Sequence, residues 1–474
     1  MKKTSSRRSS VVGRQPVRTD VKTRTQDGGR RTGDVYLDNA ATTPVDSRVV
    51  KAMLPFMTDV YANPSSLHSL GQRAGVAVRQ ARESIAAVLN GHADEIVFTS
   101  GGTESDNLAI IGTVVAASAY MKAKFGPEAK AHAVTTAIEH HAILEPLLYL
   151  QKVGEIDLTV VAPQKNGVVR ASDVLDAINE RTFLVSVMYA NNEIGTVQPL
   201  ADIGRGILKI RKNYLQENSR SAQSQSQPEG RDMRDAGPVR LRSAPLRAGY
   251  ATTYPLLHSD ACQAAGYLDL DVEKLHVDLL TLNGGKIYGP KGVGLLFVRR
   301  GIKLAPLLLG GGQERGMRSG TENVPGIVGL SVALEMAQTE KDKESKRLCA
   351  LRDRLIAGLL KILKSRLNGD AEKRLPNNVN ISFLDIEGEA AMLYLDAKGI
   401  YCSTGSACAS TALEPSHVIR ALGLSYEAAH GSLRFSLGRH TTKADVDSVI
   451  KVMPAIVERL RKISPVNLDM SYFD

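Results

Sequence analysis

The chain has 474 residues, of which 43% are apolar, and this length allows two or three domains with a substantial core. It contains no run of about 18 apolar residues and no apolar signal-peptide core, so we expect a soluble, unsecreted protein that does not span a membrane. The four cysteines form no C-x-x-C pair and are too sparse for a disulfide framework, which favours a reducing compartment and a cytoplasmic location. We expect no metal site.

The positive charge of the chain is concentrated at its N-terminus. Residues 1–33 contain ten Lys and Arg against two Asp, so they carry +8 of the formal net charge of +10. This Ser-, Arg- and Thr-rich segment lacks apolar periodicity and predicts a disordered basic tail over residues 1–34. The nearly neutral remainder argues against nucleic acid as a partner beyond non-specific contacts of the tail. Because transit peptides share this composition, import into an organelle is the alternative to a cytoplasmic location.

From Val35 onwards, short apolar β-branched runs alternate with helical stretches, which is typical of an α/β protein with a mainly parallel sheet. Nearly every motif discussed below directly follows one of these runs, and the carboxyl ends of strands are where ligands bind in open α/β sheets. The predicted strands are Glu95–Thr99, His132–Thr136, Asp157–Val161, Thr182–Met188, Pro255–Ser259, Val277–Leu280 and Gly292–Val298.

One polar segment interrupts this alternation. After a predicted helix over Ile203–Lys212, residues 213–253 are rich in Ser, Gln, Arg, Gly and Pro and have too few apolar residues to bury a face. A loop of this length inside a compact domain is usually an insertion. We therefore expect a surface loop over 213–253, which is either a tolerated insertion or a contact for a partner.

The C-terminal third predicts a second, smaller α/β region. Its elements are helices over Ile327–Lys341, Lys346–Arg366 and Lys443–Lys462 and a strand over Ser432–Leu437. The predicted domains are a large one over 50–335, a small one made of 35–49 and 336–466, and a tail over 467–474.

Three residues in separate motifs indicate one kind of chemistry. Lys286 lies in N-G-G-K-I-Y-G-P-K-G, Asp260 in H-S-D-A-C-Q-A, and Cys408 in S-T-G-S-A-C-A-S. A lysine that forms a Schiff base, a carboxylate that keeps a pyridine nitrogen protonated, and a thiol in a Gly- and Ser-rich loop together favour pyridoxal 5'-phosphate acting on a sulfur-containing substrate. Lys286 would also serve as general base and acid at Cα, and Gln263 would bond the ring hydroxyl.

Further motifs follow the predicted strands. In G-G-T-E-S-D-N, Gly102 lets backbone N–H groups approach a phosphate and Thr103 adds a hydroxyl, although the same residues also suit a simple turn with an N-cap. His140 in I-E-H-H-A would stack on the cofactor ring and move protons, or be an ordinary loop residue. Asn192 in A-N-N-E-I-G would donate to the ring phenolate or to a substrate carboxylate, or belong to a turn.

Taken together, the motifs resemble the cysteine desulfurases of the class V aminotransferase superfamily. The similarity extends from about Val35 to Ser464 and is interrupted only by the polar segment. The motifs that carry it are Y-L-D-N-A-A-T-T-P-V-D, N-P-S-S-L-H, F-T-S-G-G-T-E-S-D-N-L-A-I, I-E-H-H-A, A-N-N-E-I-G, D-A-C-Q-A, K-I-Y-G-P-K-G-V-G, G-G-G-Q-E-R-G-M-R-S-G-T-E-N, S-T-G-S-A-C-A-S and L-R-F-S-L-G-R.

The resemblance implies fold type I of the pyridoxal-phosphate enzymes and a homodimer, in which Thr321 reaches the phosphate of the other subunit. It also implies that Cys408 takes sulfur from L-cysteine as a persulfide, leaving L-alanine, and that Arg434 grips the substrate carboxylate. The long loop around Cys408 is similar to that of the branch supplying an iron–sulfur scaffold or a tRNA-thiolation partner. Selenocysteine lyase and a non-catalytic scaffold relative are the alternatives. The implied cofactor-binding residues are Gly102, Thr103, His140, Asn192, Asp260, Gln263, Asn283, Gly285, Lys286 and Thr321.

One position departs from the family pattern. The family has Ser-x-His-Lys where this chain has Asn283-Gly284-Gly285-Lys286. Asn283 retains a donor for the phosphate, but Gly285 lacks the imidazole. A lost charge-assisted contact of about 1.5–3 kcal/mol would weaken cofactor binding by roughly one to two orders of magnitude if nothing replaced it.

Overall fold

The computed structural model describes residues 33–224, 254–405 and 414–473. The chain divides into Met1–Asp34 and Val35–Asp474, and the fold described here is that of the second unit. The predicted basic tail therefore falls almost wholly outside the described residues, as do Cys408 and the greater part of the polar insertion.

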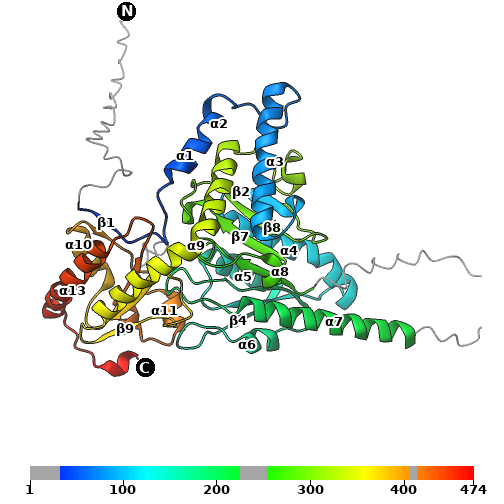
Figure 1. Ribbon diagram of the computed structural model, residues 1–474. Coiled ribbons are helices and arrows are strands. Elements are labelled where there is room, and N and C mark those ends of the chain that lie inside the picture. The colour runs from blue at the N-terminus through cyan, green and yellow to red at the C-terminus, as the bar shows by residue number, and fades with distance from the viewer. Residues whose placement is uncertain (1–32, 225–253, 406–413, 474) are drawn as a thin grey trace, which may run out of the picture. The chain divides into compact units, whose positions relative to one another are not determined.

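A seven-stranded sheet in the order β2-β8-β7-β6-β5-β3-β4 forms the centre of this unit (Figure 1). All pairings from β7 through β4 are parallel, whereas β8 is antiparallel to both of its neighbours, which confirms the predicted mainly parallel sheet. The strands are β2 (Ile96–Thr99), β3 (Ala131–Thr136), β4 (Ile156–Val161), β5 (Thr182–Ser186), β6 (Leu256–Asp260), β7 (Leu279–Asn283) and β8 (Gly294–Val298).

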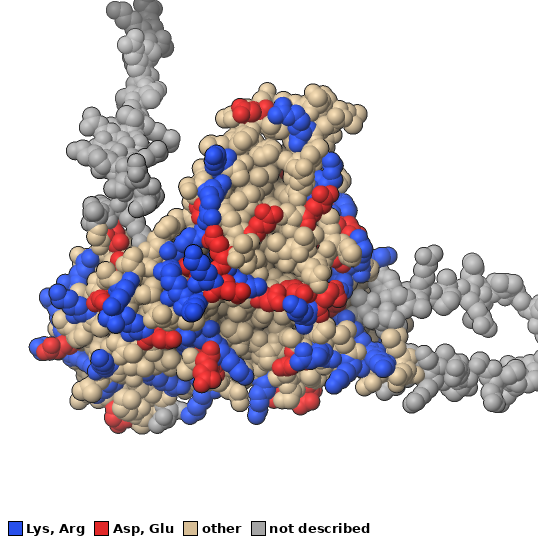
Figure 2. Space-filling view, viewed as in Figure 1, with Lys and Arg blue, Asp and Glu red and all other residues tan. Residues whose placement is uncertain are grey.

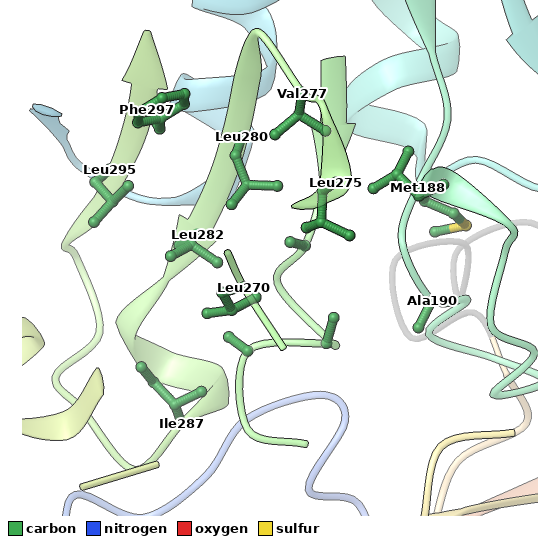
Figure 3. Close-up of a cluster of buried hydrophobic side chains, with 14 of the residues drawn as sticks. Met188, Ala190, Leu270, Leu275, Val277, Leu280, Leu282, Ile287, Leu295 and Phe297 are labelled. Atoms are coloured by element: carbon green, nitrogen blue, oxygen red, sulfur yellow. The ribbon is translucent and has the colours of Figure 1, made fainter. Parts of the chain in front are cut away.

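Alternate residues of the strands pack on opposite faces of the sheet. On one face, Leu295 and Phe297 belong to a large cluster that includes residues of α3 (Ser69–Leu89) and α9 (Val324–Leu359), and part of this cluster is seen in Figure 3. On the other face, the neighbouring residues of β8 pack with α4 (Gly102–Phe125) and α5 (His141–Lys152). Burial of both faces explains why the strands appear in the sequence as nearly continuous apolar runs.

Among the described residues, α4 is the one helix long and apolar enough to cross a membrane. It packs against α5 and several strands of the sheet. This packing accounts for the apolar character of α4.

The structure corrects two helix predictions. Helix α7 runs over Leu200–Ser224, so the predicted loop does not begin at residue 213. Residues 213–224 contain no Gly or Pro, and Leu, Gln, Glu, Arg and Ala among them favour continuation of the helix. Arg211 further fixes α7 by donating to Pro255 O and pairing with Asp278.

Helix α9 is one continuous helix where two were predicted, and it ends at Leu359 rather than Arg366. Lys343 and Glu344, between the two predicted segments, are good helix formers, and no Gly or Pro lies there to interrupt the hydrogen-bond ladder. At the C-terminal end, Ser365–Leu367 instead forms strand β9, which pairs with β10.

A second buried cluster lies in the C-terminal region, where a three-stranded antiparallel sheet has the order β12-β10-β9. Val35 and Leu37 join this cluster, and β1 pairs with β11, so the start of the unit packs with its C-terminal part. The elements of this region are β1 (Val35–Tyr36), β9 (Ser365–Leu367), β10 (Asn378–Phe383), α10 (Gly388–Asp396), β11 (Ile400–Tyr401), α11 (His417–Ala421), α12 (Tyr426–His430), β12 (Ser432–Ser436) and α13 (Lys443–Ile463).

The predicted C-terminal tail is in part ordered, because Phe473 is 5% exposed within the main core cluster. Basic and acidic side chains are interspersed over the visible face of the molecule in Figure 2, in keeping with the nearly neutral composition after residue 33. The remaining elements are α1 (Ser47–Met53), α2 (Pro55–Thr58), α6 (Ala171–Asp176), α8 (Val272–Leu275) and the 3-10 turns Ala93–Glu95, Gly284–Lys286, Gln313–Gly316 and Met470–Phe473.

Candidate active site

A cavity of about 260 Å³ opens at the carboxyl ends of the sheet strands. Asp260 is the last residue of β6 and Asn283 the last of β7, so strand geometry alone places both at this edge. The predicted site residues that line the cavity are Gly102, Thr103, His140, Asn192, Asp260, Gln263, Asn283, Lys286 and Arg434.

The other predicted residues are placed differently. Gly285 lines an adjoining cavity together with Thr103 and Lys286. Thr321 is exposed and lines neither cavity, and Cys408 lies outside the described residues. The described residues of this one chain therefore form the site except for the nucleophilic cysteine and the contribution expected from Thr321 of a second subunit.

The N-terminus of α4 forms an anion cradle. Its N-cap, Gly101, has φ +155° and no side chain to satisfy the first N–H groups of the helix, which therefore remain available to an anion. A Cβ atom at Gly102 would lie 3.0 Å from the Cys262 sulfur, a tight contact that would require Cys262 to shift, so glycine suits this position. Across the cradle, Asn283 accepts a hydrogen bond from Gly285 N at 3.0 Å through Oδ1, and its Nδ2 amide is left as the donor group.

Lys286 reaches the cavity from the turn that follows β7. Its Nζ donates to Ala41 O at 2.5 Å. Thr43 holds the same turn, because its backbone N–H and its hydroxyl both donate to Gly285 O and its hydroxyl accepts from Tyr288 N. The segment before α1 thus fixes the backbone that carries the lysine.

Asp260 is 9% exposed and accepts from Cys262 N at 2.8 Å. Behind it lie three buried ionisable groups. Burial raises the pKa of Asp106 well above its usual range and that of Glu139 to about 8, and burial lowers the pKa of His258 to about 4. Burial therefore favours the uncharged form of all three groups behind the Asp260 carboxylate.

His140 is the N-cap of α5, and its Nδ1 accepts from Ala142 N at 3.1 Å. This hydrogen bond places the proton of the neutral ring on Nε2. Burial lowers the pKa of His140, which favours the neutral ring. His140 therefore caps a helix, and its ring also lines the cavity.

Arg434, on β12, is 2% exposed and is held by three acceptors. It donates to Asp38 Oδ1 at 2.8 Å and to the carbonyl oxygens of Asn192 and Gly405 at 3.1 Å each. Its Nε is buried without a hydrogen-bond partner among the described residues. An unpaired buried donor costs about 1–3 kcal/mol, and more when its group is charged, and a ligand carboxylate would satisfy this donor.

Asn191 makes the hydrogen bonds of the turn, so the Asn192 side chain is not needed for them. The Oδ1 of Asn191 accepts from the N–H groups of Glu193 and Ile194, and its Nδ2 donates to Ile138 O at 2.8 Å. The first asparagine of A-N-N-E therefore builds the turn anticipated from the sequence, and the second lines the cavity.

Several functional contacts were not predicted from the sequence. Asp38 and Ala41 belong to the quoted Y-L-D-N-A-A motif, but nothing local in the sequence shows that they meet Arg434 and Lys286. The Gln263 amide donates to Ala40 O at 2.9 Å. This is the amide group that was expected to bond the ring hydroxyl of the cofactor. Glu193, next to Asn192, accepts from the Ser416 hydroxyl. Its place in the A-N-N-E-I-G motif was the one sequence feature that could have indicated a role for it.

Two of the other cysteines are poor nucleophiles. Cys262 lines the cavity, but burial and then the nearby Asp260 raise its pKa well above the usual range. Burial raises the pKa of Cys402 to about 12, and this residue packs in the C-terminal core cluster. Both are therefore thiols rather than thiolates at neutral pH.

Comparison with known proteins agrees with this fold and this set of side chains. The family model of class-V aminotransferases matches residues 35–215 and 251–449, with its gap at the polar insertion. The chain therefore belongs to the class-V aminotransferase family, whose enzymes depend on pyridoxal phosphate.

Within that family, this chain is one of the cysteine desulfurases. It is 46% identical to cysteine desulfurase IscS of Methanosarcina thermophila, over 91% of this chain and 94% of that one. It is 45% identical to cysteine desulfurase IscS 1 of Archaeoglobus fulgidus, over 91% and 98% of the two chains. Among solved structures, a NifS-like protein superimposes with a TM-score of 0.74 at 35% identity, covering 90% of this chain and all of that one. A structure of SspA in complex with cysteine gives 0.66 at 32% identity, over 86% and 100%.

Proposed function

We propose that this chain binds pyridoxal 5'-phosphate through Lys286 and converts L-cysteine to L-alanine, with the sulfur held as a persulfide on Cys408. The observation that carries this proposal is the cavity in which the Lys286 amine, the Asp260 carboxylate and the Arg434 guanidinium meet from three distant motifs. The glycine cradle at α4 fits a phosphate, and the unpaired Nε of Arg434 fits a substrate carboxylate.

Each side chain has a defined task in this reaction. The bound cofactor would supply an electron sink for the pair left on Cα when its proton is removed. Lys286 would take that proton as general base, and His140 would carry the proton on Nε2 that it exchanges with the substrate. Asp260 would hold the protonated ring nitrogen, and Arg434 would fix the carboxylate of the amino acid.

Cys408 would complete the reaction as a thiolate that attacks the substrate sulfur. The new S–S bond forms as the Cβ–S bond breaks, and the electron pair left on Cβ takes up a proton to give alanine. Gly405 lines the cavity, and the three residues from it to Cys408 span at most about 10 Å when extended. The chain length alone thus allows the thiol to reach the substrate.

The proposed assembly is a homodimer in which Thr321 contributes to the partner's phosphate site. It is supported by large apolar side chains that are exposed on the single chain, such as Leu54 at 51%, Leu67 at 90% and Leu309 at 83%. The proposed location is the cytoplasm, and the proposed sulfur acceptor is an iron–sulfur scaffold or a tRNA-thiolation protein.

The function is tested by incubating the purified protein with L-cysteine and a thiol reductant. We expect alanine and sulfide in equal amounts, and we expect Cys408→Ser to keep the bound cofactor but form neither product. Turnover of L-selenocysteine without turnover of L-cysteine would instead identify a selenocysteine lyase. A protein without visible cofactor absorbance and without turnover would be a non-catalytic relative.

A further inference from the structure

The phosphate end of the site has a second cavity of about 370 Å³ beside the first. It is lined by the start of α4 at Gly102 and Thr103, by Asn283 and Gly285 on the lysine turn, and by Lys291 in the following G-P-K-G. It therefore brings a second lysine to the cradle that the α4 N-terminus forms.

The surroundings of Gly285 show which residue lies where a side chain at this position would point. The backbone of Gly285 does not have the positive φ that only glycine adopts readily. A Cβ atom built there would lie 3.5 Å from Lys291 Cγ, and the nearest backbone atom, Lys291 Cα, would be 3.9 Å away. The stem of Lys291 thus borders the space that a side chain at position 285 would enter.

The Lys291 ammonium group has no acidic partner within the described residues. Its side chain is exposed and has no hydrogen bond or ion pair within the described ranges. Glu104 lines the same cavity, but it already accepts from Arg318 Nε at 2.9 Å and from Ser100 N at 2.8 Å. An ammonium group on a flexible stem is a common ligand of phosphate.

We propose that Lys291 supplies the cationic contact to the cofactor phosphate that Gly285 lacks. The inference rests on the proposed function, since the ligand is pyridoxal phosphate. In this chain, the Lys291 ammonium group would thus take the place of the imidazole that the family has at position 285. The affinity for the cofactor phosphate would then be retained.

The test compares two ligands that differ only in the phosphate. Full-length Lys291→Met protein, freed of cofactor with hydroxylamine, is titrated with pyridoxal phosphate and with pyridoxal, following visible absorbance. We expect the dissociation constant for pyridoxal phosphate to rise about 10- to 100-fold and that for pyridoxal to stay unchanged. Lys209→Met, at an exposed lysine of α7, is the matched control and should change neither value.

A second variant tests whether the two positions share one role. Gly285→His alone should alter affinity little, whereas Gly285→His combined with Lys291→Met should recover most of the lost affinity. Equal binding of pyridoxal phosphate by wild type and Lys291→Met, or equal losses for both ligands, would overturn the inference and leave the proposed function intact. Failure of the wild-type protein to bind pyridoxal phosphate would overturn both.

Discussion

Replacing Arg434 with lysine should selectively weaken recognition of a substrate carboxylate. Arg434 is fixed by Asp38 and two backbone carbonyls, so its guanidinium is oriented before a substrate arrives. Its Nε is the donor that lacks an acceptor within the described chain. Lysine keeps the positive charge but presents a point charge instead of a planar pair of donors.

The expected magnitude follows from the donors that are lost. A bidentate guanidinium–carboxylate contact has two charge-assisted hydrogen bonds, and lysine retains one of them. Loss of one such bond, at about 1.5–3 kcal/mol, lowers kcat/KM for L-cysteine by roughly 10- to 150-fold. The cofactor absorbance should be unchanged, because Arg434 is assigned to the substrate end of the cavity.

The assay must separate this effect from a disturbance of the chain at Gly405, which Arg434 also holds. Cysteamine serves this purpose because it is cysteine without the carboxylate. We expect Arg434→Lys to reduce kcat/KM for L-cysteine while leaving the binding of cysteamine, followed by the change in cofactor absorbance, nearly unchanged. Equal losses with both compounds would show that Arg434 acts only by shaping the site, and full activity with L-cysteine would refute a carboxylate role altogether.

Other expectations concern the lysine, the buried acid and the cysteines. Lys286→Ala should abolish both visible cofactor absorbance and turnover, so full activity in this variant would rule out Lys286 as the cofactor lysine. Because burial raises the pKa of Glu139 from an ordinary 4.5 to about 8, the folded protein holds a proton that the unfolded chain releases. The free energy of unfolding should therefore fall as pH rises from about 4.5 to about 8, and Glu139→Gln should flatten this dependence in thermal melts; identical slopes would show that Glu139 is ionised in the fold. Cys402→Ser should keep most activity, since that thiol is buried in the C-terminal core, and its inactivation would point to a direct role.

The sheet could be predicted from the sequence because its strands are covered on both faces. Each of the seven runs predicted from apolar, β-branched composition corresponds to a strand, with ends that shift by a few residues. The helices were harder to delimit, because charged or polar helix formers such as those after Lys212 and Lys341 continue a helix without an apolar stripe. Composition alone therefore predicted a loop after Lys212 and a break after Lys341, and at both places the structure has continuous helix.

The site was predictable where a motif follows a strand, and it was not where contacts depend on tertiary packing. Asp260 and Asn283 end neighbouring strands, so their proximity follows from local sequence. Asp38 and Arg434 are 396 positions apart, and their ion pair arises only because the start of the fold packs with its C-terminal region. The placement of Lys291 against Gly285 is local, but it depends on the backbone path of the turn after β7, which the sequence does not specify.

The central claim is that Cys408 receives the sulfur, and single-turnover mass spectrometry tests it most directly. The holoenzyme is mixed with one equivalent of L-cysteine without reductant, quenched, alkylated and digested. We expect one additional sulfur atom on the peptide that contains Cys408, in an amount equal to the alanine formed. Alanine formation with the extra sulfur on Cys402 or Cys262, or with no protein-bound sulfur, would contradict the account.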